Sequence, residues 1–583
     1  MSSVAVPAAG PPSASGRDAT AATAATAAGV LAELRRARRK QRVAEIHWID
    51  ALYQVYITAL LSLVAVLVLS GLTGDGKVGA DVVRQAVNRG PAVLGLAAAV
   101  MLLIGLRSGC RGGPLALEKA DVRHVLLSPI DRGAALRPAA LRQLRFSLFA
   151  AFVVGAVAGQ LAVRRLGGSG AVWVLCGVVF AVAAVGLAVG AALVASGRRV
   201  HPLLGSTIGF VLVAWSLTDL LGRAPTAPLT FLGRAALWPL RFDALALVPM
   251  AVVVGLVVAG VSAVSGVSLE AAERRTALVG QMKFAVTLQD LRTVLVLRRQ
   301  LAMELPRSKP WIGGQTGTRP ARGRRARVSR VPVWRRGWRG VLRWPAARVA
   351  RLVVLAVGAG LALRGAWDGT TPLFLVGGLA LWIAALDVIE PLAQETDHPG
   401  RLDAYPMERG QLMVRHLAVP MAAMLPVTLV AAAAAVLAGP STRALQVAAL
   451  AVVPATLAAV CGAVISVLMG APKPFDTLSM TAPEIAGMRT LLRTTWPPLV
   501  AVLGTVPLLA ARAAMQHPPL RFATVEAAAG LGVLTLTLLT LGWVRFRDDI
   551  HAWWAQLAAD AKATQDAKAA ARRERTQPEE LDP

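Results

Sequence analysis

The chain has 583 residues, of which 55% are hydrophobic, and its mean hydropathy is +0.57. Uncharged apolar runs long enough to cross a bilayer, about 20 residues each, recur along the chain and exclude an ordinary soluble globular protein. The formal net charge of +29 would suit nucleic-acid binding, but the basic residues cluster in alternate segments between apolar runs. This pattern predicts an all-α polytopic membrane protein, because helices satisfy their own backbone hydrogen bonds in lipid.

About twelve spans are predicted in two groups of six. They cover residues 51–73, 90–106, 146–163, 171–196, 204–221 and 244–264, then 350–363, 372–389, 418–437, 445–469, 496–510 and 523–544. The run 350–363 is the shortest, and it can span only if Arg351 and Arg364 extend toward the two interfaces. The predicted domains are a disordered tail with a basic interfacial helix (1–48), a first six-helix half (49–268), a basic cytoplasmic linker with amphipathic helices (269–349), a second six-helix half (350–545) and a cytoplasmic tail (546–583).

The distribution of basic residues predicts the orientation. With the N-terminus in the cytoplasm, the inner segments hold 50 of the 62 Lys and Arg residues. Cytoplasmic loops are enriched in these residues, so both termini are expected inside. In the linker, Trp334, Trp338 and Trp344 are interleaved with arginines, which suits a helix lying on an anionic membrane surface. A plain linker with interfacial anchors also fits this pattern and is the favoured interpretation. Membrane lipids are therefore expected partners, and nucleic acid is not.

A gapless internal repeat organises the chain. Residues 114–133 and 391–410 align at a constant offset of 277 residues. The identical pairs are Pro114 and Pro391, Leu115 and Leu392, Ala116 and Ala393, Glu118 and Glu395, Pro129 and Pro406, Arg132 and Arg409, and Gly133 and Gly410, while Asp131 matches Glu408 in charge. Each copy follows the second span of its half on the predicted inner side. This placement predicts two six-helix halves in parallel orientation, a feature of transporters.

The repeat has two interpretations. Pro129 and Pro406 would interrupt a short preceding helix. Asp131 and Glu408 would then lie at the start of the next helix, where a carboxylate stabilises the positive helix end. The motif could only cap and turn the chain, or it could contact a partner protein. Contact with a partner is favoured, because capping alone does not need the matching Pro-Leu-Ala-x-Glu upstream.

At this loop the chain resembles the type-2 ABC exporter permeases, in which an acidic stretch precedes a Leu-rich Ser/Thr-Pro turn with Arg nearby. The first copy has Glu118, Asp121, Val-Leu-Leu-Ser-Pro at 125–129, Asp131 and Arg132. The second copy keeps Glu395, Pro406, Glu408 and Arg409 but has Asp-Ala-Tyr at 403–405 in place of Leu-Leu-Ser. The central stretch 279–311 is also similar to that of actinobacterial ABC exporter membrane proteins.

The resemblance implies a bacterial inner-membrane permease made of two fused half-domains. In that family each half begins with an amphipathic helix, here 31–48 and 333–348, and the loop forms a coupling helix that docks onto the ATPase. A separate ABC ATPase dimer would then be the partner of the nine loop residues above, and the exported substrate is not identified by the sequence.

No catalytic, cofactor or metal site is expected. The run 71–77 (GLTGDGK) begins like a phosphate-binding loop, but Val78 follows where Ser or Thr is needed, so the chain itself is not expected to hydrolyse ATP. The histidines show no metal-ligand spacing. Asp387 and Glu390 end the eighth span and are expected to be solvated.

Two other functions stay open. An ion-coupled secondary transporter would need a buried ionisable pair, and no chain of mid-membrane carboxylates is evident in the sequence. A non-transporting membrane scaffold or membrane-bound enzyme would need no path between the halves.

Overall fold

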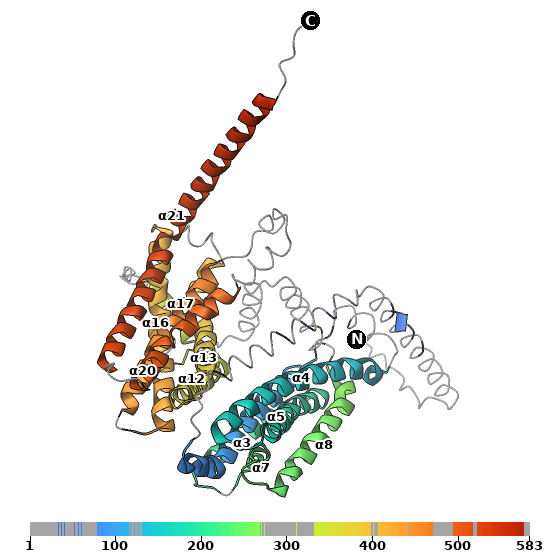
Figure 1. Ribbon diagram of the computed structural model, residues 1–583. Helices are drawn as coiled ribbons and strands as arrows, with labels where there is room; N and C mark the ends of the chain where they lie inside the picture. The colour runs from blue at the N-terminus through green and yellow to red at the C-terminus, as the bar shows by residue number, and fades with distance from the viewer. Residues whose placement is uncertain are drawn as a thin grey trace, which may run out of the picture. The chain divides into compact units, whose positions relative to one another are not determined.

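The computed structural model describes residues 78–115, 131–224, 226–268, 332–397, 406–441, 443–469, 494–516 and 522–576, with isolated residues between these ranges. Every regular element in these ranges is a helix (Figure 1). Ten of the helices are long and apolar enough to cross a membrane, and one bent helix pair could form an eleventh span. The predicted all-α polytopic membrane fold is confirmed. The predicted span 51–73 lies almost entirely outside the described residues.

The chain divides into two compact units, Met1–Phe284 and Ala285–Pro583. The long helices of the first unit are α3 (Ala80–Cys110), α4 (Arg132–Leu166), α5 (Gly170–Gly197), α6 (Pro202–Leu220) and α8 (Leu247–Ala263), with the short helix α7 (Pro228–Ala236) before α8. Helix α5 packs against α3, α4 and α8, and α3 also packs against α6 and α7.

Small residues allow close helix contacts in this first unit. A Cβ atom on Gly155 of α4 would lie only 2.5 Å from the carbonyl oxygen of Gly177 on α5. In a membrane, helices associate through such close backbone approach, because the surrounding lipid tails are as apolar as the helix surfaces and the hydrophobic effect contributes little to helix association.

The second unit contains α11 (Pro332–Val341), α12 (Ala346–Trp367), α13 (Leu373–Val388), α14 (Glu390–Thr396), α16 (Arg409–Ala438), α17 (Ala444–Leu468), α20 (Val506–Gln516) and α21 (Phe522–Thr576). Helix α17 lies at its centre, and 78% of the most apolar stretch of this helix is buried inside the protein. It packs against α13, α16, α20 and α21.

The two units share a pattern of helix pairs. In the first, α5 contacts the two long helices before it, α3 and α4, and also α8. In the second, α17 contacts α13 and α16 before it, and α21 near the C-terminus. If α3 and α13 are the second spans of their halves, the same three pairings occur in both units.

The shortest predicted span is longer than the sequence suggests. Helix α12 has 22 residues and contains Arg348, Arg351 and Arg364 within its length. Arg364 donates through Nε to Asp368 Oδ2 at 3.0 Å. The other two arginines pair with acids of neighbouring elements; Arg348 is buried, whereas the Arg351 side chain is 42% exposed. Pairing with carboxylates therefore accommodates Arg348, and Arg351 combines such a pair with exposure.

Candidate functional site

In the first copy of the repeat, Asp131 is the N-cap of α4. Its carboxylate accepts hydrogen bonds from the backbone N–H of Ala134 at 2.9 Å and of Gly133 at 3.1 Å. These two backbone donors hold the pKa of the Asp131 carboxyl below its usual value. The expectation that Asp131 lies at the start of the helix is confirmed.

The remainder of this copy is described in part. Arg132 is exposed at the first residue of α4. Glu118, Asp121 and Pro129 lie outside the described residues. The described apolar residues of the loop are buried and pack against α4, α5 and the residues that follow α8; they are Leu115, Leu117, Val122 and Leu126. This apolar packing holds the loop against the helix ends of its unit.

In the second copy, the Pro-Leu-Ala-Gln-Glu segment forms α14, which is bent by 58° from α13. Leu392, Ala393 and Glu395 are buried, with relative exposures of 0%, 1% and 2%. Glu395 Oε1 accepts from Arg336 of α11 at 2.8 Å. The repeated glutamate therefore ties α11 to α14 in this unit, and its carboxylate does not face solvent.

Glu408 occupies the position equivalent to Asp131 but makes different contacts. It is the N-cap residue of α16, yet its side chain makes no capping hydrogen bond. Both carboxylate oxygens instead bind the guanidinium of Arg545 on α21, with 2.7 Å between Oε2 and Nη2. The expected position is confirmed, but the carboxylate joins α16 to α21. Pro406 and Arg409, which flank it, are exposed.

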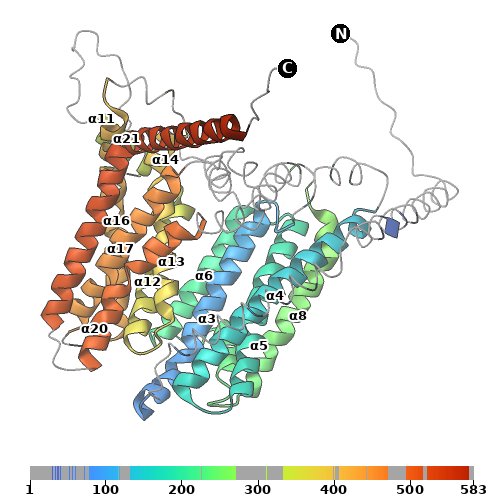
Figure 2. The same ribbon diagram turned by 45° about the horizontal axis from the view of Figure 1, so that its top comes forward.

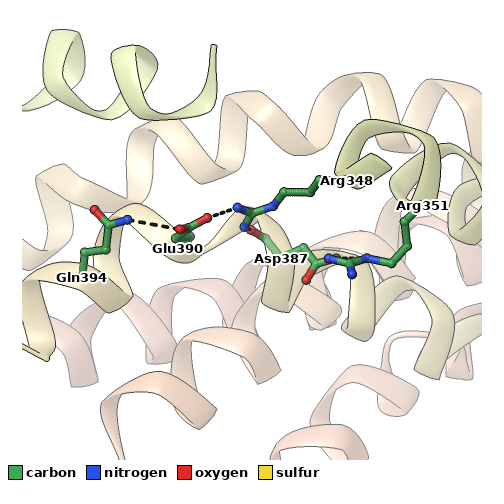
Figure 3. Close-up of polar contacts among 5 residues, drawn as sticks. All are labelled: Arg348, Arg351, Asp387, Glu390 and Gln394. Atoms are coloured by element: carbon green, nitrogen blue, oxygen red, sulfur yellow. Dashed lines mark hydrogen bonds and ion pairs between the residues drawn. The ribbon is translucent and has the colours of Figure 1, made fainter. Parts of the chain in front are cut away.

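A cluster of ion pairs lies beside the second copy, in which Arg348, Asp387 and Glu390 are buried and Arg351 is exposed (Figure 3). Arg351 on α12 donates through Nε to Asp387 Oδ2 at 2.7 Å. Arg348, one turn earlier, forms an ion pair with Glu390 and also binds the backbone carbonyl of Asp387. Gln394 donates to Glu390 Oε1 at 3.1 Å. The cluster joins α12 to both arms of the α13–α14 bend.

The cluster corrects the expectation that Asp387 and Glu390 are solvated. Their relative exposures are 7% and 5%. Removing an unpaired charge from water costs several kcal/mol, so these carboxylates are stable inside the protein only because each has an arginine partner. A signal exists in the sequence: Arg348 and Arg351 share the three-residue spacing of Asp387 and Glu390. This spacing puts the two arginines on one face of α12, whereas the two acids lie on either side of the α13–α14 bend.

Comparison of the chain with models of protein families, with curated proteins and with solved structures gives no match in any of the three. Among the residues that the structure describes, no three His, Cys, Asp or Glu side chains are grouped so that they could hold a metal ion. The repeated loop and the charge cluster beside it are the features from which a function is proposed below.

Proposed function

We propose that the protein is the membrane-spanning permease subunit of an ATP-driven, ABC-type exporter, energised by a separate ATPase dimer. The observation that carries the proposal is the repeated loop after the second span of each half. In the second unit its first five residues form the start of α14, a short helix bent 58° from α13 at the end of that span. The proposal includes the bacterial inner membrane as location and the cytoplasm for both termini and both loops.

The contacts of α14 are suited to an element that transmits movement of the ATPase to the membrane-spanning helices. Its buried face and the Arg336–Glu395 ion pair hold it against α11. The pairs from Arg348 to Glu390 and from Arg351 to Asp387 join the bend to α12. Closure of an ATPase dimer against α14 would therefore move α12 and α13 together, as a rigid-body transition requires.

The burial of Glu395 decides which residues of the repeat could touch the ATPase. A carboxylate that is 2% exposed cannot form an intermolecular contact without unfolding the loop. Pro406, Glu408 and Arg409 are exposed in the second copy, and Arg132 is exposed in the first. We assign the docking contacts to these exposed residues and a supporting role to Glu395.

Charge reversal of the matched arginines tests the proposal. The chain would be co-expressed with a candidate ATPase, and their association and the rate of ATP hydrolysis would be measured for wild type and for the double variant Arg132→Glu, Arg409→Glu. Loss of two contacts to an acidic docking surface should weaken association by about tenfold or more. Arg443→Glu is the matched control: it reverses the charge of an exposed residue between α16 and α17 and should leave association unchanged. Equal association and equal stimulation for wild type and the double variant would overturn the proposal.

The buried charge cluster favours a second candidate, an ion-coupled secondary transporter. Such a transporter needs buried ionisable groups, and Asp387 and Glu390 qualify. Both, however, are neutralised by arginines, which suits a structural connection better than a site that exchanges ions. Substrate uptake by proteoliposomes under a proton or sodium gradient, with no ATPase and no ATP, would favour this candidate.

A further inference from the structure

A cavity of about 190 Å³ lies beneath α11 in the second unit. Its walls come from α11, the turn between α11 and α12, the first turn of α12, α14 and α16, and they include Arg343, Trp344, Arg348, Glu395 and His416. The volume is several times the roughly 30 Å³ that one water molecule occupies in the liquid. The cavity is therefore large enough for a small polar group.

Two buried acceptors on its wall lack hydrogen-bond donors, and one buried donor there, Arg348 Nε, lacks an acceptor. Glu390 Oε2 is held by its ion pair with Arg348. Glu395 Oε1 is bound by Arg336, but Glu395 Oε2 has no donor. His416 Nε2 also has no partner, and the His416 side chain is only 3% exposed. A carboxylate oxygen can only accept, and Nε2 accepts in one neutral tautomer of imidazole. Buried polar atoms are nearly always hydrogen-bonded, so this end of the cavity is suited to a ligand that donates hydrogen bonds.

The rim of the cavity has the opposite chemistry. Arg343 lines the cavity and is exposed. Around the whole cavity, three arginines face two glutamates; they are Arg336, Arg343, Arg348, Glu390 and Glu395. A complementary ligand therefore combines a donor-rich ammonium, for the buried acceptors, with an anionic group for the rim.

The position of α11 indicates where such a ligand comes from. Trp334 and Trp338 on α11 pack edge to face with ring centroids 5.6 Å apart. Trp side chains and basic amphipathic helices concentrate at the level of lipid headgroups. Figure 2 shows α11 and α14 at the same end of the unit, where the span α13 finishes. This arrangement favours a lipid headgroup as the source of the ligand.

We propose that this cavity binds the headgroup of an aminophospholipid, such as phosphatidylethanolamine. The ammonium donates to Glu395 and His416, and the phosphate binds Arg343. The site holds α11 against α14 and α16, since all three contribute to it. The proposal is independent of the proposed transport function and would hold if no ATPase bound the chain.

Lipid binding to the purified full-length protein tests the site. Dissociation constants would be measured by native mass spectrometry for phosphatidylethanolamine and phosphatidylcholine with identical acyl chains. Because the choline nitrogen has no N–H donors, phosphatidylethanolamine should bind about tenfold more tightly. Phosphatidylglycerol, which has the phosphate without the ammonium, should also bind more weakly. Equal affinity for phosphatidylethanolamine and either of the other lipids would overturn the proposal.

Variants test which residues contact the ammonium of the headgroup and which contact its phosphate. Arg343→Ala should weaken phosphatidylethanolamine binding by about fivefold, since it removes a charged contact to phosphate. Arg339→Ala removes an exposed arginine of α11 that does not line the cavity, and it should leave binding unchanged. Glu395→Gln should abolish the preference for phosphatidylethanolamine over phosphatidylcholine. Unchanged affinity in Arg343→Ala, or a preference that survives in a folded Glu395→Gln protein, would contradict the proposed contacts.

A soluble competitor distinguishes the lipid from a free zwitterion. Phosphoethanolamine in solution offers the same ammonium and phosphate without acyl chains. It should compete only at concentrations far above those of the lipid. Competition at equal concentration would overturn the assignment to a lipid.

Discussion

At the scale of single residues, equivalent positions of the repeat have diverged in their contacts. Asp131 binds two backbone N–H groups of its own helix, whereas Glu408 binds Arg545 of another helix. The Glu408 side chain has one more methylene group than the Asp131 side chain, which lets its carboxylate extend away from the helix axis. The charge at this position is kept in both copies, but it caps a helix in the first unit and joins two helices in the second.

The cap at Asp131 predicts a pH-dependent stability. Removing the side chain in Asp131→Ala should lower the stability by about 1 kcal/mol, because two N–H groups lose their acceptor. The folded protein holds the pKa of Asp131 below its usual value, so the cap stabilises the fold above the pKa of the unfolded chain. This contribution is lost as the pH falls through the pKa of the folded state. Thermal unfolding in detergent, measured from neutral to acid pH, should show the wild type and Asp131→Ala converging at low pH.

Asp131→Asn is the control for this prediction. Its amide oxygen can still accept one backbone hydrogen bond, but the side chain does not titrate. A difference between wild type and Asp131→Ala that is the same at every pH would contradict the assignment of the cap to the ionised carboxylate.

At the scale of elements, α12 depends on charges that lie outside it. Arg348 is 8% exposed and contacts Glu390 and the face of Trp344, with 4.3 Å between the guanidinium carbon and the ring centroid. Arg351 contacts Asp387 in the same bend. Helix α12 can therefore lie in the membrane with two arginines near one end, because α13 and α14 provide the compensating carboxylates.

Breaking one of these pairs should be costly. Arg348→Met leaves Glu390 buried without its cation, and the loss of stability should be roughly 3–5 kcal/mol. The double variant Arg348→Met, Glu390→Met removes both charges and should recover most of that loss. Unfolding of both variants in the same detergent gives the coupling between the two residues.

Arg84→Met is the control, because its partner Asp81 is 83% exposed and exposed pairs contribute at most about 1 kcal/mol. A single Arg348→Met variant as stable as this control would contradict a structural role for the buried pair.

At the scale of the whole molecule, hydropathy predicts where helices run but not which side chains meet. The predicted spans 171–196 and 445–469 agree closely with α5 (Gly170–Gly197) and α17 (Ala444–Leu468), because each is an uninterrupted apolar run. Helix α7 was not predicted, since its nine residues are too few to give a spanning pattern.

The charge cluster around Asp387 and Glu390 shows why contacts between side chains of different segments could not be predicted from the sequence. A hydropathy pattern measures the transfer of one segment into lipid and contains no term for a partner on another helix. Arg351 therefore counts against the span 350–363, and Arg348 falls in the predicted amphipathic helix 333–348, although both lie in α12 and pair with carboxylates of the α13–α14 bend. In the same way, Glu395 was expected at a docking surface, and its burial against α11 depends on contacts between segments far apart in the chain.

The proposed exporter needs both copies of the repeated loop on the cytoplasmic side, where an ATPase could reach them. The direct test replaces Cys110, Cys176 and Cys461 with Ala, introduces single cysteines at the matched positions Arg132→Cys and Arg409→Cys, and labels them with a membrane-impermeant thiol reagent. Arg223→Cys, exposed in a predicted outer loop, is the control and should be labelled in intact cells. Both repeat positions should be protected in intact cells and labelled in inside-out vesicles. Labelling of either repeat position from outside the cell would contradict the account.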